Sequence, residues 1–562
     1  MSVNAPAPAG QAGTREWLGL AVLCLPTVVL SVDATVLYLA LPHLAADLQP
    51  TGTQTLWIID IFGFLLAGLL IAMGTIGDRI GRRRLLMIGA VGFTAASLLA
   101  AYADSAEVLI VARAMLGISG ATLMPSTLSL IRNMFTDAKQ RAQAIAIWSG
   151  FFASGAALGP PVGGLMLETF WWGSVFLLAV PAMALLLLAA PFLLPEYRSP
   201  STHRLDLVSV VLSLAGIIAF IWGVKELAED GIRVLPAAVL VAGVVLGALF
   251  VRRQSRVPDP LVDVSLFRRK EFSATLATML VGIGVLGGVY LFIAQYLQLV
   301  KDQSPLEAGL WLLPSAFVMM VTASVAPVLT RWIRPGYVVG LALLMTAVGH
   351  LMLLAVGPTD SVWVLVAALM VLFGGIGPVF ALGTDLVVGA APPERSGSAA
   401  AISETASELG LALGIALLGS IGVAVYRSNM DGSVTDGLPD EAAEAASETL
   451  PGALAVAEEL PPETGGPLVE QAIRYFMDGF HVTALVCGVV VLVLALVSFV
   501  LLRDTRPPAP AAAEGDAPGE SPAPAGRHAA AESYPPGGHT PAVGHLSPES
   551  GAPAGRHASA ES

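Results

Sequence analysis

Fourteen apolar runs, each about as long as a bilayer is thick, divide this 562-residue chain. A helix rises 1.5 Å per residue, so about 20 residues cross the roughly 30 Å of hydrocarbon. Only 13% of the residues are charged, whereas a soluble domain carries about 25%. The sequence therefore predicts an all-α integral membrane protein and nearly excludes a soluble enzyme. The runs lie near residues 17–41, 56–75, 85–103, 108–131, 142–167, 174–194, 207–224, 234–251, 273–300, 306–330, 338–356, 362–389, 398–426 and 480–502.

Lysines and arginines alternate between the two sides of the membrane in a way that orients these spans. Positive charge accumulates in cytoplasmic loops. With the N-terminus inside, 23 of the 29 basic residues fall in cytoplasmic loops or termini. A miscounted span would break this pattern. We therefore expect a multi-pass protein of the plasma membrane with both termini cytoplasmic.

Three polar segments stand apart from the spans. Residues 1–16 form a short cytoplasmic segment, and residues 427–479 form an extracellular loop with eleven acids and two bases. The tail, residues 503–562, is rich in Ala, Pro and Gly and repeats one ten-residue sequence almost unchanged, so we expect it to be disordered and cytoplasmic. The loop and the tail carry most of the net charge of -13, which leaves the membrane body almost neutral. Whether the loop is only a connector or attracts cations stays open.

Five ionisable side chains lie well inside apolar runs. Each costs about 2.5 to 3.5 kcal/mol at a helix centre, so five facing lipid would cost about 12 to 18 kcal/mol. They must therefore face one another or a wet cavity. Four carboxylates against one arginine leave an excess of acid, which is suited to binding protons and a cationic ligand. The five are Asp33, Asp60, Arg113, Glu404 and Glu408, with Asp385 nearer a helix end.

Motifs for other chemistries are missing from the sequence. The chain has no Walker A loop and no HExxH motif, and Cys24 and Cys487 lie within apolar runs. We therefore expect no enzymatic activity, no metal, no cofactor, no use of ATP and no binding of nucleic acid. An ion gradient remains as the source of energy.

The loop after the second run has a specific spacing of glycine, aspartate and arginine. Gly74 and Gly81 allow a tight turn, and Asp78 can pair with arginines or cap a helix. This loop resembles the signature loop of the major facilitator superfamily. The resemblance implies a latch in which Asp78 caps the thirteenth helix, after Pro392, Pro393 and Arg395. Its residues are Gly74, Asp78, Arg79, Gly81, Arg82 and Arg83.

Two further motifs resemble those of the same superfamily. Arg113, with Gly117 and Gly120, is similar to the fourth-helix motif that is associated with proton coupling. The fifth run resembles the antiporter motif, whose small residues permit close packing and whose prolines bend the helix. That motif consists of Gly155, Gly159, Pro160, Gly163 and Gly164.

The chain resembles the 14-helix drug:proton antiporters, especially the quaternary ammonium compound and multidrug efflux pumps. The resemblance lies in the number of spans and in the segments 31–35, 57–60 and 403–410. The resemblance implies two six-helix bundles, residues 17–195 and 273–502, with two helices inserted at 207–251. Some relatives carry another carboxylate in the tenth helix, whereas residues 310–330 here have none. That difference argues against recognition of divalent cations.

The resulting hypothesis is proton-coupled export of lipophilic, often cationic drugs, such as quaternary ammonium compounds, dyes, antiseptics and antibiotics, by a chain that works as a monomer. The interior acids, with Arg113, would exchange protons for the drug. Aromatic side chains could add cation–π contacts of about 1 to 2 kcal/mol each. A narrow exporter of one endogenous antibiotic or metabolite, or a membrane sensor that transports nothing, stays open. The candidate aromatic residues are Trp148, Tyr290, Tyr296 and Trp311.

Overall fold

The computed structural model describes residues 12–198, 206–230, 233–258, 260–391, 396–430 and 438–501. Within these ranges, 14 helices are long and apolar enough to cross a membrane, which confirms the predicted number. The described residues contain no β-strand. Most of the predicted segment 1–16 and the whole tail 503–562 lie outside the described residues, and so do Pro392, Pro393 and Arg395.

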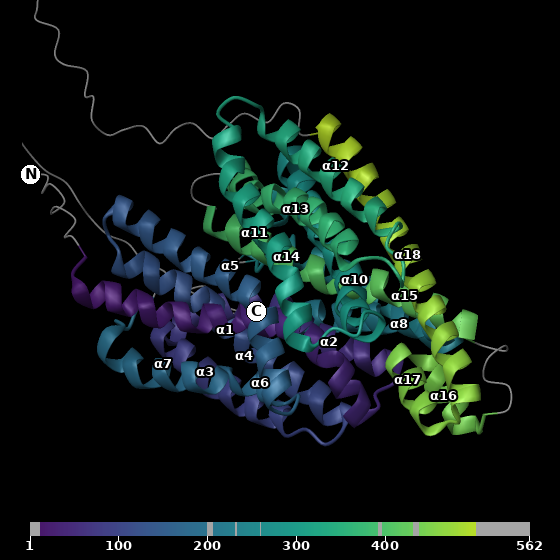
Figure 1. The fold of residues 1–562 in the computed structure, drawn as a ribbon. Coiled ribbons are helices and arrows are strands. Elements are labelled where there is room, and N and C mark those ends of the chain that lie inside the picture. The colour runs from purple at the N-terminus through teal and green to yellow at the C-terminus, as the bar shows by residue number, and fades with distance from the viewer. Residues whose placement is uncertain are drawn as a thin grey trace, which may run out of the picture. The chain divides into compact units, whose positions relative to one another are not determined.

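The first six spans make up the N-terminal half (Figure 1). Its sixth span is divided into two helices. The helices of this half are α1 (Thr14–Leu48), α2 (Gly52–Ile80), α3 (Arg82–Ala101), α4 (Ala106–Met134), α5 (Ala138–Thr169), α6 (Ser174–Leu177) and α7 (Ala179–Leu193). Within it, α1 packs along α5 and α7, while α4 packs along α2 and α3.

Two inserted helices and then the C-terminal half follow. The inserted pair is α8 (Leu207–Asp230) and α9 (Val234–Gln254). The C-terminal half begins after the short 3₁₀ turn η1 (Val264–Arg268). Its elements are α10 (Lys270–Gln295), the π-helical turn η2 (Tyr296–Val300), α11 (Pro305–Leu329), α12 (Pro335–Leu353), α13 (Val362–Ala390), α14 (Ser396–Gly414), the π-helical turn η4 (Ile415–Gly419), α15 (Ser420–Met430), α16 (Asp440–Glu448), α17 (Leu450–Glu459) and α18 (Pro462–Leu501). The bundle limits 17–195 and 273–502 stay predictions.

Side-chain caps set the first residues of several helices. The Thr51 hydroxyl accepts from the backbone N–H of Gln54 at 3.2 Å, and the Gln54 side chain accepts from the N–H of Thr51 at 3.0 Å. Ser304 and Glu307 form the same reciprocal pair at the start of α11. These contacts satisfy N–H groups that have no partner inside the helix.

The segment between the last two spans is more helical than the sequence predicted. Instead of a loop alone, it contains α16 and α17, and α18 begins at Pro462 rather than near residue 480. The Tyr426 hydroxyl donates to the carbonyl oxygen of Ala446 at 3.0 Å, and Leu450 is buried. Counting apolar residues finds only the membrane-embedded part of a helix, so polar turns beyond it were missed.

Glycines bring helices close together in both halves. On α14, a side chain at Gly414 would overlap the carbonyl oxygen of Gly284 on α10. Lipid chains are as apolar as the side chains, so helices in a membrane gain from close backbone approach rather than from hydrophobic exclusion.

We therefore expect Gly414→Ala to lower the stability of the purified protein by about 1 to 3 kcal/mol, because the added methyl group overpacks the α10–α14 contact. Thermal unfolding in detergent measures the effect. Gly247→Ala is the matched control, since Gly247 of α9 has open space around it. Equal melting temperatures for the two variants would contradict this explanation.

Candidate functional site

Arg113 is the central charged residue of the N-terminal half. Its guanidinium Nη1 lies 2.6 Å from Asp33 Oδ2 of α1, and its Nε donates to the carbonyl oxygen of Ile58 on α2 at 3.0 Å. The guanidinium carbon also lies 4.7 Å from the centre of the Phe62 ring. Arg113 is only 2% exposed. One side chain of α4 thus holds α1 and α2 together through an ion pair, a hydrogen bond and a cation–π contact.

Asp60 and two tyrosines lie beside this ion pair. Asp60 of α2 is 1% exposed, and both Asp60 and Arg113 act electrostatically on the buried Tyr38. The Tyr38 ring packs edge-to-face on Tyr290 of α10, with 4.7 Å between ring centres. Tyr290 in turn lies 6.4 Å from the ring of Phe373 on α13. An aromatic row therefore connects the acidic interior of the N-terminal half to the C-terminal half.

Glu404 and Glu408 lie on α14 in the C-terminal half. They are four residues apart and therefore share one face of the helix. Both are partly buried, and each acts electrostatically on the other. Among the described residues, no cation pairs with either carboxylate. Asp385, near the end of α13, is exposed.

The glycine-rich segment of α5 has two packing faces. Side chains at Gly155 and Gly159 would overlap the hydroxyls of Ser31 and Thr35 on α1, and one at Gly163 would overlap Val36. The second face meets α11. There Gly164 lies against the backbone of Pro305, and Gly309 lies against the backbone of Pro160. The motif thus joins α5 to its own half and to the other half.

The two halves contact each other along α2 and α14 and, in addition, at the end of the helices where α1 ends and α2 begins. The α5–α11 contact lies there, and so does Gln298, whose side-chain Nε2 donates to the carbonyl oxygen of Leu39 at 3.1 Å. Leu39 precedes the end of α1, and α2 starts just beyond that end. The signature loop lies at the other end of α2, so these contacts are opposite the loop.

The signature loop is organised by its own charges. Gly81 has φ of +113°, a conformation that L side chains rarely adopt, and it separates α2 from α3. Arg82 Nη2 lies 2.6 Å from Asp78 Oδ1, and Arg82 Nη1 donates to the carbonyl oxygen of Pro125 on α4. A side chain at Gly74 would be in ordinary contact with Pro125, and Arg79 is exposed. The predicted recipient of a cap from Asp78 lies outside the described residues.

Glu196 is a partner of this loop that the sequence analysis missed. It follows α7, and its carboxylate lies 3.7 Å from Arg83 Nε and 3.8 Å from Arg84 Nε. The backbone N–H of Arg82 also donates to the carbonyl oxygen of Tyr197 at 2.9 Å. A lone glutamate after a helix has no distinctive pattern in sequence. Only the fold brings it to a loop more than 100 positions earlier.

The other candidate aromatics are at separate places. Trp148 of α5 is partly buried. The Tyr296 hydroxyl donates to the carbonyl oxygen of Gly357 at 2.8 Å. Trp311 Nε1 donates to Gln303 at 3.0 Å, and its ring packs edge-to-face on Trp363. The structure therefore brings Tyr290 to the acidic interior, whereas Tyr296 and Trp311 contact loops at the helix ends.

The described residues offer no group of three or more His, Cys, Asp or Glu side chains that could hold a metal ion. A comparison with protein families matches residues 23–415 to the Major Facilitator Superfamily. The chain belongs to this family. It is therefore a multi-pass membrane transporter.

Several characterised relatives are drug-resistance transporters. The multidrug efflux pump LfrA of Mycolicibacterium smegmatis is 47% identical over 87% of this chain and 97% of its own length. The methyl viologen resistance protein SmvA of Salmonella typhimurium is 32% identical over 86% of this chain and 97% of its own. The tetracenomycin C resistance and export protein of Streptomyces glaucescens is 31% identical over 87% and 92%.

Solved structures of other transporters have the same fold. A bacterial homolog of the human lysosomal transporter Spinster, in an inward-facing and unoccupied conformation, matches with a TM-score of 0.60 and 17% identity, over 88% of this chain and 98% of that chain. A peptide transporter in complex with sulfate matches with a TM-score of 0.55 and 16% identity, over 86% and 95%. At these identities the likeness shows the fold alone.

Removing Arg113 should strongly destabilise this protein. Arg113→Gln would leave Asp33 buried without its counter-ion, which we expect to cost about 3 to 5 kcal/mol. Adding Asp33→Asn should recover part of that loss. The melting temperatures of the single and double variants in detergent measure both effects.

Arg474→Gln is the control for this prediction. Arg474 pairs with Glu470 at 3.2 Å, and both side chains are mostly exposed. An exposed pair of this kind contributes at most about 1 kcal/mol. If Arg113→Gln melted no lower than Arg474→Gln, the buried ion pair would not be stabilising the N-terminal half.

Proposed function

We propose that this protein is a proton-coupled antiporter that exports lipophilic, often cationic drugs across the plasma membrane. The observation that carries the proposal is the 47% identity to a multidrug efflux pump over nearly the full length of both chains. The second relative is named for resistance to methyl viologen, which is a bipyridinium dication, and this supports a cationic substrate class.

The interior carboxylates supply the proton exchange in this proposal. Glu404 and Glu408 stack on one face of α14 without a cationic partner among the described residues, so each is suited to take up a proton or to face a drug cation. Asp60, which is buried, supplies a third interior acid. Protonation of Asp33 would break its ion pair with Arg113, which would couple proton uptake to a movement of α4 against α1.

The direction of transport follows from the predicted orientation. The basic signature loop is expected on the cytoplasmic side. Pro160 with Gly309 and Gln298 with Leu39 join the two halves at the opposite end, so that end would be closed toward the outside. A drug would enter from the cytoplasmic side, and rocking of the halves would release it outside as the acids regain protons. The membrane potential supplies about 2.3 kcal/mol per charge per 100 mV.

A narrow exporter of one antibiotic is the second candidate. It is favoured by the relative that confers resistance to tetracenomycin C, at 31% identity. We expect resistance to several chemically unrelated cations when the protein is expressed in a drug-sensitive host, and minimum inhibitory concentrations measure this. Protection against a single compound only would favour the narrow exporter.

Binding of ethidium should release protons from the purified protein if the acids exchange protons for drug. We expect Glu404→Gln and Glu408→Gln each to reduce the protons released per ethidium bound, because each substitution removes a titratable carboxyl group. A pH indicator in weakly buffered detergent solution measures the release.

Glu470→Gln is the matched control, since Glu470 is an exposed acid near the end of the outer segment. It should release as many protons as the unaltered chain. Ethidium uptake into inverted vesicles should also stop when the proton gradient is collapsed. Unchanged uptake without a gradient would refute the coupling, and full proton release from both glutamine variants would remove these acids from it.

A further inference from the structure

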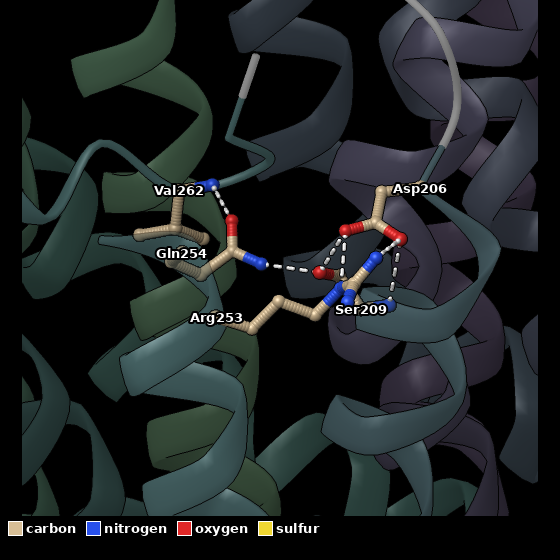
Figure 2. Close-up of polar contacts among 5 residues, drawn as sticks. All are labelled: Asp206, Ser209, Arg253, Gln254 and Val262. Carbon is tan, nitrogen blue, oxygen red and sulfur yellow. Dashed lines mark hydrogen bonds and ion pairs between the residues drawn. The ribbon is translucent and has the colours of Figure 1, made fainter. Parts of the chain in front are cut away.

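A hydrogen-bonded ion pair joins the two inserted helices, α8 and α9, at one end (Figure 2). Asp206 directly precedes α8, and Arg253 lies in the last turn of α9. Asp206 Oδ2 accepts from Arg253 Nε at 2.7 Å, and Oδ1 accepts from Nη2 at 2.9 Å. Such a two-pronged contact between carboxylate and guanidinium fixes orientation as well as distance.

Three more residues extend this ion pair into a network. The Ser209 hydroxyl donates to Asp206 Oδ2 at 2.6 Å and accepts from Gln254 Nε2 at 2.7 Å. Gln254 Oε1 then accepts from the backbone N–H of Val262 at 3.1 Å. Ser209 and Gln254 are buried. The network, which we call the Asp206 clamp, thus ties the start of α8 and the end of α9 to the segment that leads into the C-terminal half (Figure 2).

The carboxyl group of Asp206 stays ionised at neutral pH. The hydrogen bonds from Arg253, helped by those from Ser209, lower the pKa of Asp206 to about 2. An unfolded aspartate has a pKa of about 3.9. Because the folded pKa is the lower one, the contact stabilises the protein fully above about pH 4 and is lost only as the pH falls toward 2.

The helix that the clamp holds lies along the seam between the two halves. On α8, Ile221 is buried in one cluster with Phe64 of α2 and with Ala412 of α14 and Ala416 of η4. Two turns earlier on the same helix, the Leu214 side chain fills the space beside Gly68 of α2. α8 therefore contacts α2 and the α14–η4 segment at once, whereas α9 is largely exposed.

The same seam borders the face of α14 that carries the candidate proton-exchange acids. Glu408 is four residues before Ala412, so the two share a helix face, and the neighbouring Leu409 packs against the seam cluster. The other end of the clamp reaches this helix too. Val262 packs against a second cluster that includes Ile402 and Ala406 of α14.

We propose that Asp206 is a positioning residue for proton coupling, which holds α8 in the seam between α2 and α14 and so keeps Glu404 and Glu408 from exchanging protons outside the transport cycle. This inference rests on the proposed function. Loosening the clamp would let α8 leave the seam. Protons and lipid headgroups would then reach α14 from the side, and a proton leak without drug would follow.

The test uses the full-length chain in liposomes. Proton flux is followed with a pH-sensitive dye under an imposed gradient, without drug and then with ethidium. We expect Asp206→Asn to raise the drug-free proton flux by about 2- to 30-fold, the range that corresponds to coupling through packed helices. The double charge reversal Asp206→Arg with Arg253→Asp should restore a flux near that of the unaltered chain. Glu470→Gln, which removes an exposed acid of similar charge, should change nothing.

A second readout does not depend on transport. The pair Leu214→Cys and Gly68→Cys, in a chain that also carries Cys24→Ala and Cys487→Ala, should crosslink readily, and Asp206→Asn should lower the yield of the crosslink. If Asp206→Asn cannot be purified in a folded form, Ser209→Ala replaces it, because it removes the bridging hydroxyl and keeps both charges. That variant should show a smaller increase in leak.

Two results would overturn the proposal. One is a drug-free flux and a crosslinking yield that are unchanged in Asp206→Asn or, in its place, Ser209→Ala. The other is a leak that the charge reversal fails to reduce. Failure of the proposed function is seen separately, as an absence of ethidium-driven proton flux in the unaltered chain.

Discussion

An arginine in the middle of a membrane protein requires a counter-charge, and the N-terminal half is built around that requirement. Arg113 on α4 meets Asp33 on α1 and the backbone of α2, and Phe62 covers its guanidinium. Leaving either charge alone in hydrocarbon would cost several kcal/mol. The helices α1, α2 and α4 are therefore held in one arrangement, and Asp60 and Tyr38 lie beside the ion pair.

Close packing of glycines provides the second constraint. Gly155, Gly159 and Gly163 let α5 lie against α1, while Gly164 of the same helix meets α11 across the two halves. In lipid, such contacts depend on fit rather than on exclusion of water. One face of α5 is thus tightly packed in its own half, while Gly164 makes a contact with the other half that would have to open in the proposed transport cycle.

The sequence predicted the fold more fully than the site. Apolar runs and basic loops yielded all 14 spans, because crossing a bilayer requires a length that can be counted directly. The polar helices α16 and α17 were missed, because water-exposed helices leave no such run. The acids were found from the cost of burying them. Glu196 and the Asp206 clamp were not, because both lie at helix ends, where charges are common.

The sequence by itself determined that this chain spans a membrane 14 times and that a few charges must face its interior, since both follow from the cost of polar groups in hydrocarbon. The tertiary structure decided which charges pair. It placed Arg113 against Asp33, 80 positions away, left Glu404 and Glu408 together on α14, and joined Asp206 to Arg253. Pairing depends on which helices become neighbours, and that is set by packing between residues far apart in the chain.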